Sequence, residues 1–140
     1  MHVTAIHEVI NHIPNLKSVA EKVEWLQKHD SRPLRNILIL TYDRTKELYV
    51  PDVEPPYKPS TLEEIEGMLL SKARMLNYIV KGFSDPNVPQ AKREDIFINL
   101  LESVHAEDAK ILIKMIKREP FPGLTAKTIN KAFGDIINVS

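Results

Sequence analysis

The sequence contains no cysteine, which excludes disulfide frameworks, thiolate zinc sites and cysteine nucleophiles. Glycine is nearly as scarce, with four residues in a chain of 140, so there is little material for a glycine-rich loop that binds nucleotide phosphates. The Gly-x-Ser-x-Gly pattern of α/β-hydrolases is also missing from the chain. We therefore expect a protein that is not an enzyme and that carries no cofactor.

An excess of charge of one sign and long apolar runs are missing as well. Nineteen Lys and Arg residues balance nineteen Asp and Glu residues, so the formal net charge is zero. Any binding to DNA must therefore come from a local patch, and it should be weak and sensitive to salt. No run approaches the roughly 20 apolar residues that span a bilayer, and no signal-peptide pattern opens the chain. These observations predict a soluble, intracellular protein with no membrane partner.

The length and the apolar pattern predict one globular domain over residues 1–140. Apolar residues make up 43% of the chain and charged residues 27%, as is ordinary for globular proteins. Apolar positions recur at helical spacing through most of the sequence. We expect six or seven helices.

Capping signals mark where some of these helices begin. Thr4 can cap a first helix that Pro14 ends. Ser18 and Glu21 have the spacing of a capping box and predict the start of a second helix. The apolar side of that helix, which should face the core, includes Val19.

The middle of the chain combines a proline-rich loop with a long helix. Residues 51–59 hold four prolines, and residues 56–59 match the loose Pro-x-x-Pro pattern of recognition peptides. A bare match of this kind is weak, and a connecting loop is the favoured interpretation. Ser60 and Glu63 then form a capping box, which predicts an α-helix to about Val80.

The segment at residues 34–42 is ambiguous between helix and strand. Ser31 and Pro33 supply helix start signals. The same apolar run, together with residues 47–50, could instead form a β-hairpin. A continuous apolar run does not discriminate between the two, so both remain open on the residues alone.

The end of the chain carries the clearest charge pattern. Between Lys110 and Lys131 there are six basic residues and one acidic residue, Glu119. A lysine-striped helix runs into the Pro-Phe-Pro-Gly turn at residues 120–123, and a capped helix follows. This arrangement suits a nucleic-acid backbone, because the N–H groups at the start of the second helix can meet a phosphate. A solvated helix face is the structural alternative.

Ten residues are candidates for contact with the DNA backbone. Most are basic residues of these two helices, joined by Thr125 and Thr128 at the start of the second. Arg35 and Arg44 bracket the apolar run of residues 34–42, where either could reach a phosphate or form a surface ion pair of little energetic value. The full set is Arg35, Arg44, Lys110, Lys114, Lys117, Arg118, Thr125, Lys127, Thr128 and Lys131.

Histidine and aromatic patterns offer weaker candidates. His7 and His12 are five residues apart, which points them about 140° apart on a helix, whereas the zinc-binding spacing of four puts both on one face. We predict that they bind no metal. Four aromatic residues could stack on bases, but they are not interleaved with basic residues, so core packing is the favoured interpretation; they are Trp25, Tyr42, Tyr49 and Phe133.

Four blocks of sequence carry a resemblance to a known family. They are residues 18–30, residues 40–44, residues 115–119 with the glycine that follows the turn, and residues 128–133. In this order they resemble the N-terminal helical DNA-binding domain of ATP-dependent DNA ligases, in the form carried by T-even-type phages. The chain also resembles small proteins of large tailed phages, including cyanophages, that share the Pro-Tyr-Lys-Pro loop.

The resemblance implies an all-α fold, which favours a helix at residues 34–42. It further implies binding to the minor groove of nicked duplex DNA through backbone contacts, in the cytoplasm of an infected host cell. The chain departs from the family in two ways. The Lys-x-Asp-Gly adenylation motif is missing, so nucleotidyl transfer by that chemistry is excluded, and residues 120–122 lengthen the turn.

Two functions remain open. The first is a non-catalytic phage accessory protein that binds duplex DNA, without sequence specificity, in replication, repair or recombination. The alternative is a protein-interaction module that binds or inhibits a phage or host replication protein, which the zero net charge and the proline loop favour. A continuous positive surface favours the first function, and a patch interrupted by carboxylates favours the second.

Overall fold

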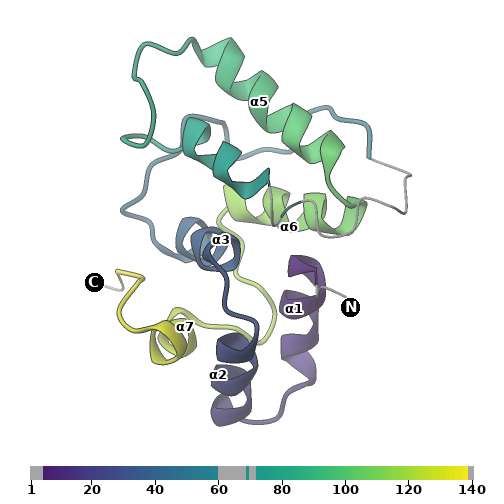
Figure 1. Cartoon of the computed structure of the whole chain (residues 1–140), viewed down its shortest axis with the longest axis vertical. Helices are drawn as coiled ribbons and strands as arrows, with labels where there is room; N and C mark the ends of the chain where they lie inside the picture. Colours follow the sequence, from purple (N-terminus) through teal and green to yellow (C-terminus); the bar gives the residue numbers. More distant parts are fainter. Residues whose placement is uncertain (1–4, 60–68, 70–71, 139–140) are drawn as a thin grey trace.

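The computed structural model describes residues 5–59, 69 and 72–138, and the regular structure in this part is helical (Figure 1). The α-helices are α1 (Ile6–His12), α2 (Val19–Lys28), α3 (Arg32–Tyr42), α5 (Gln90–Ser103), α6 (Ala106–Ile116) and α7 (Ala126–Phe133), and the 3₁₀ helices are η1 (Ile13–Asn15) and η3 (Ala73–Ile79). An isolated bridge joins Leu48 to Val80, and no described residue belongs to a longer strand. The expected all-α fold is confirmed.

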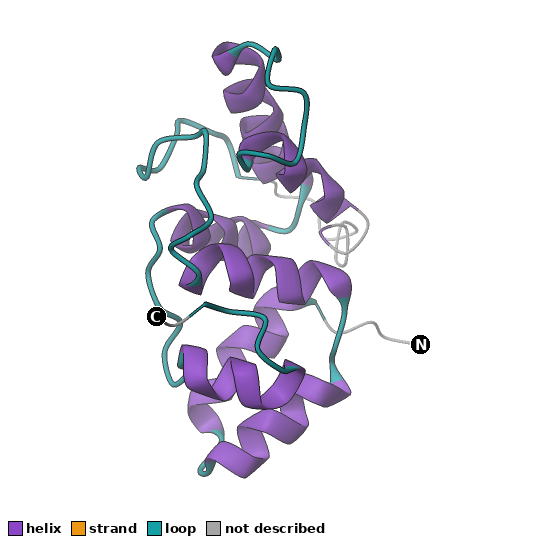
Figure 2. Ribbon diagram, turned by 90° about the vertical axis from the view of Figure 1, so that its left-hand side faces the viewer, coloured by secondary structure: helices purple, strands orange, loops and turns teal. Residues whose placement is uncertain are grey.

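Helix α6 lies at the centre of the molecule. It packs against α1, α3 and α5, and seven of its 11 residues are buried. Helices α2 and α7 pack on each other at one end of the molecule, and α5 packs on η3 at the other (Figure 1). Figure 2, which is turned about the same vertical axis, shows the same elongated stack of helices from the side. The apolar face of each helix therefore packs on a neighbouring helix.

Residues 34–42 belong to α3, so the helical interpretation is confirmed and the hairpin is wrong. The Ser31 hydroxyl accepts a hydrogen bond from the Leu34 N–H at 3.2 Å and caps the helix. Ile37 and Leu38 are fully buried. The continuous apolar run is thus explained by a helix that has neighbours on more than one side.

Residues 47–49 pair with residues 79–81 through two backbone hydrogen bonds, of 2.7 and 2.9 Å between N and O atoms. This pairing fixes the end of η3. The α-helix predicted to about Val80 is therefore wrong over its described end, because Ala73–Ile79 is 3₁₀. The predicted start of that helix, at Ser60 and Glu63, lies outside the described residues.

The caps of the first two α-helices give a mixed result. The Ser18 hydroxyl accepts a hydrogen bond from the Glu21 N–H at 3.1 Å, which confirms the predicted start of α2. Val19 is 46% exposed, so its predicted inward orientation is wrong. The N-cap of α1 is Ala5, whereas the expected cap, Thr4, lies outside the described residues.

Candidate nucleic-acid interface

A shallow hollow of about 480 Å³ gathers four basic side chains and one carboxylate. The pairing of residues 47–49 with residues 79–81 brings two parts of the chain together at this point. Arg118, two residues after the end of α6, completes the lining. The lining residues are Arg44, Lys46, Glu47, Leu48, Lys81 and Arg118, and we call this site the basic hollow.

Charge is only partly neutralised in the basic hollow. The pKa of Arg118 lies below its ordinary value, chiefly because of burial and secondly because of repulsion by Arg44, while Asp43 acts in the opposite direction. Lys81 pairs with Glu47 at 3.2 Å, but both side chains are well exposed, so the pair contributes little. The positive patch is thus interrupted by one carboxylate, and its like charges repel each other.

Arg118 has a structural role that the sequence did not indicate. Its guanidinium donates hydrogen bonds to the carbonyl oxygens of Leu40 at 2.6 Å and Asp43 at 2.9 Å, and also to that of Lys46. Its backbone is left-handed, with a φ of 58°. The prediction that Arg118 contacts a phosphate is corrected, because its donors are directed at the end of α3.

Hydrogen bonds of the Tyr42 hydroxyl hold the turn between α6 and α7 in place. The Tyr42 hydroxyl accepts a hydrogen bond from the Phe121 N–H at 2.8 Å and donates to the Leu124 carbonyl at 2.7 Å. The Phe121 side chain is buried. Burial raises the pKa of Tyr42 to about 12, and the hydrogen bond with Phe121 opposes this rise. The Pro-Phe-Pro segment is therefore anchored to the core through Phe121.

Gly123 seats this turn against the connection between α1 and α2. Its φ is +76°, and a Cβ atom on it would lie 3.1 Å from the Cα atom of Pro14, so a larger residue would be strained by its backbone conformation and crowded against Pro14. The Lys22 ammonium donates a hydrogen bond to the Gly123 carbonyl at 2.7 Å. The start of α7 is thereby fixed beside the first turn of α2.

The two threonines at the start of α7 act on the helix itself. The Thr125 hydroxyl accepts a hydrogen bond from the Thr128 N–H at 3.2 Å, which is an N-cap. The Thr128 side chain is buried and lies 3.1 Å from that of Thr125, measured between hydroxyl oxygens. The expectation that the Thr128 side chain meets a phosphate is corrected, because it faces the interior.

The helical period predicts that the lysine stripe of α6 faces solvent above buried Leu112 and Met115. Both apolar side chains are fully buried, Lys110 and Lys117 are exposed, and Lys114 is partly exposed. Lys110 pairs with Glu107 at 3.0 Å, and this hydrogen bond raises the pKa of Lys110. Lys114 and Lys117 form no ion pair with a residue in the described part of the chain.

The other predicted cations divide in the same way. On α7, Lys127 and Lys131 are exposed and form no ion pair with a described residue. Arg35 pairs with Asp30, at 2.9 Å from Nε to Oδ1, so the surface ion pair was the correct alternative for it. Arg44 is exposed and belongs to the basic hollow. Of the ten candidates, the structure brings Arg44 and Arg118 together in one hollow.

The histidines of α1 diverge as their spacing predicts. His7 lies 2.8 Å from the Asp108 carboxylate, from Nδ1 to Oδ1, whereas the His12 ring packs against Trp25 with 4.4 Å between ring centroids. Across residues 5–59, 69 and 72–138 no group of three His, Cys, Asp or Glu side chains could hold a metal ion. The Trp25 indole donates to the Val9 carbonyl, so this aromatic residue is packed rather than free to stack.

A protein-family model, described as a family of unknown function, DUF6433, matches residues 9–119. The chain belongs to the DUF6433 family. No curated protein matches the chain. The part matched by DUF6433 contains every residue of the basic hollow and ends before α7. Among the described helices, none combines the length and apolar character needed to cross a membrane.

We predict that the change of Tyr42 to phenylalanine weakens the fold at neutral pH and reduces its sensitivity to alkali. The folded-state pKa of about 12 lies above the ordinary value of 10.0. Wild-type stability from this group is therefore full below about pH 10 and is lost as pH rises through about 12, because the unfolded chain releases the proton first. Urea unfolding measured between pH 9 and pH 12 should show a smaller loss of unfolding free energy in Tyr42→Phe than in wild type.

The exposed Tyr78 provides the matched control. Tyr78→Phe should keep the alkaline loss seen in wild type. Equal pH profiles for wild type and Tyr42→Phe would show that the Tyr42 hydroxyl is not buried against the turn in solution.

Proposed function

We propose that the protein is a non-catalytic accessory protein that binds the phosphate backbone of duplex DNA, in the replication, repair or recombination of a phage genome in an infected cell. The observation that supports this proposal is the basic hollow, where four basic residues and one carboxylate meet in a chain of zero net charge. The resemblance to the DNA-binding domain of phage DNA ligases supports it independently.

A phosphate would relieve the repulsion between the cations of the hollow. Arg44 is exposed, and its charge acts unfavourably on Arg118. A guanidinium can hold two phosphate oxygens at once, and a nearby ammonium adds a point charge. Lys46 can supply that ammonium, and Lys117, which precedes Arg118, extends the cations along the surface. Since no array of Arg, Asn and Gln lies on one helix, binding should be insensitive to base sequence.

Binding of fluorescent duplexes to the full chain tests this proposal. About three phosphate contacts, counted from the exposed cations, predict that log affinity falls with log salt at a slope of about −3. Arg44→Glu with Lys46→Glu should weaken binding to nicked, gapped and intact duplexes alike and make the slope shallower by roughly one to two. Fluorescence anisotropy at several salt concentrations gives both quantities.

Lys17→Glu with Lys28→Glu is the matched control, because it changes the net charge equally at exposed positions before and at the end of α2. This control should retain most of the affinity. No binding by wild type at about 50 mM salt and tens of micromolar protein would reject the DNA function, since a backbone contact is strongest at low salt.

A second candidate is a protein-interaction module that binds or inhibits a phage or host replication protein. Two observations favour it. One is that Glu47 interrupts the positive patch of the basic hollow, which is the arrangement expected for this function. In addition, α5 and the proline loop enclose an apolar hollow that shares no lining residue with the basic hollow and includes acidic residues in its lining. DNA would be repelled from such a surface, so the two candidate functions make separable predictions.

A further inference from the structure

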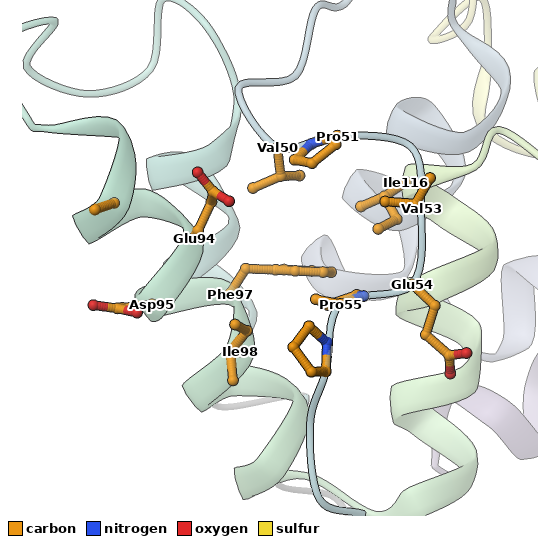
Figure 3. A pocket seen from close by; sticks show the side chains of 12 residues that line it. Val50, Pro51, Val53, Glu54, Pro55, Glu94, Asp95, Phe97, Ile98 and Ile116 are labelled. Carbon is orange, nitrogen blue, oxygen red and sulfur yellow. The ribbon is translucent and has the colours of Figure 1, made fainter.

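The proline loop and α5 enclose an apolar hollow of about 440 Å³, which we call the acidic groove. Its lining includes the apolar residues Val50, Pro55, Phe97 and Ile116 and the acidic residues Glu94 and Asp95. Figure 3 shows Phe97 reaching from α5 into the space between that helix and the loop, with Pro55 on the opposite side. Phe97 and Ile116 are buried, so they form a firm apolar floor.

Charge in the acidic groove has one sign. Glu54, Glu94 and Asp95 belong to the lining, and no Lys or Arg does. None of these three carboxylates forms an ion pair with a residue in the described ranges. Figure 3 places Glu94 at the end of the groove near Val50 and Glu54 on the loop side. The apolar floor is thus flanked by negative charge on both walls.

The loop that forms one wall is held in place. Pro51, Pro55 and Pro56 restrict its backbone, since each proline fixes its own φ angle. Close by, the Lys58 N–H donates a hydrogen bond to the Glu102 carboxylate of α5 at 2.8 Å. A wall that is ordered before binding lowers the entropy cost of binding.

We infer that the acidic groove binds a peptide segment of a partner protein in which apolar side chains are flanked by Lys or Arg. The volume of the groove and its floor suit one or two apolar anchors. The carboxylates at its edge then select cationic flanks and disfavour acidic ones. Val53, on the loop, is 56% exposed and offers apolar surface that such a segment would cover.

A labelled twelve-residue peptide tests this inference: a central Leu-Phe-Leu-Phe block with four lysines on each side. One comparison peptide carries serines in the central block, and another carries glutamates in the flanks. The full chain should bind the first peptide at least about tenfold more tightly than either comparison peptide, because both the floor and the edge contribute. NMR shifts of backbone amides should be confined to residues 50–56, residues 91–98 and the neighbourhood of Ile116.

Glu94→Lys should weaken binding of the first peptide by about tenfold, whereas Glu24→Lys, the same change at an exposed site on α2, should not. Equal losses in the two variants would mean general charge attraction and would overturn the inference. No binding of the first peptide at millimolar concentration, equal binding of the serine peptide, or self-association of the chain through these residues would also overturn it.

The same variants separate this inference from the DNA proposal. Glu94→Lys should leave the salt slope for DNA unchanged, and Arg44→Glu with Lys46→Glu should leave peptide affinity unchanged. If the wild-type chain bound the peptide and not DNA, or DNA and not the peptide, the proposal for the missing activity would be rejected and the other would be retained.

Discussion

Replacement of Arg93 by methionine is expected to lower the free energy of unfolding by about 3 kcal/mol, because it leaves buried acceptors without donors. The Arg93 side chain is 1% exposed. Its guanidinium donates to the carbonyl oxygens of Tyr78 and Asp85, both at 2.6 Å, and to the Ser84 hydroxyl at 2.7 Å. It also lies 3.8 Å from the centre of the Tyr49 ring. One side chain thus fastens η3 and the following loop to α5.

Urea unfolding followed by far-UV circular dichroism measures this effect. Lys92→Met is the control on the same helix, where the exposed side chain should change stability by no more than about 0.5 kcal/mol. The stability of Arg93→Lys should lie between those of Arg93→Met and wild type. One ammonium cannot reach all three oxygen atoms to which the planar guanidinium donates. If Arg93→Met were as stable as wild type, the buried network would contribute no net stability.

Local signals in the sequence predicted the helices whose starts are capped. The Ser18 and Ser31 hydroxyls each accept a hydrogen bond from the N–H three residues on, as their spacing to the following apolar residues indicates. The same holds for Thr125 at the start of α7. These interactions lie within one helical turn, so a short stretch of sequence contains everything they need.

The role of Arg93 could have been found from the same periodic pattern. Position 93 lies four residues before Phe97 and eight before Leu101, which places it on the apolar face of α5. An arginine on such a face must be satisfied inside the protein.

The basic hollow and the acidic groove could not be predicted in this way. The hollow depends on the pairing of residues 47–49 with residues 79–81, for which no turn or spacing gives a signal. The groove depends on where the proline loop lies against α5. Both are long-range arrangements, in which packing decides which charges become neighbours.

Among the candidate DNA contacts, helical periodicity predicted which lysines are exposed but did not predict which polar side chains bind the protein's own backbone. The stripe of α6 faces solvent as its period requires, because burial of Leu112 and Met115 forces the intervening lysines outward. Thr128 was assigned from its place at the start of a helix and Arg118 from its place in the lysine stripe, and both side chains face the protein. A basic or hydroxyl side chain at a helix end serves the chain's own backbone groups as readily as those of a ligand. Contact between DNA and the remaining candidates stays a prediction.

The change of Arg118 to alanine is expected to lower the free energy of unfolding by about 2 kcal/mol while leaving DNA contacts to other residues in place. Its guanidinium satisfies the carbonyl oxygens of Leu40, Asp43 and Lys46 around the end of α3. The last carbonyl groups of a helix have no partner within the helix. Removal of the Arg118 donors therefore leaves these carbonyl oxygens without hydrogen bonds, which destabilises the folded state. Thermal and urea unfolding at neutral pH measure the loss.

Two further variants isolate the cause of that loss. Arg118→Gly removes the same donors but suits the left-handed φ of 58°, so it should be roughly 1 kcal/mol more stable than Arg118→Ala. Lys117→Ala, at the exposed neighbouring position, should keep wild-type stability and make the salt dependence of DNA binding shallower. The opposite pattern, with Arg118→Ala fully stable and Lys117→Ala unfolded more easily, would show that position 118 faces solvent and would restore Arg118 as a phosphate ligand.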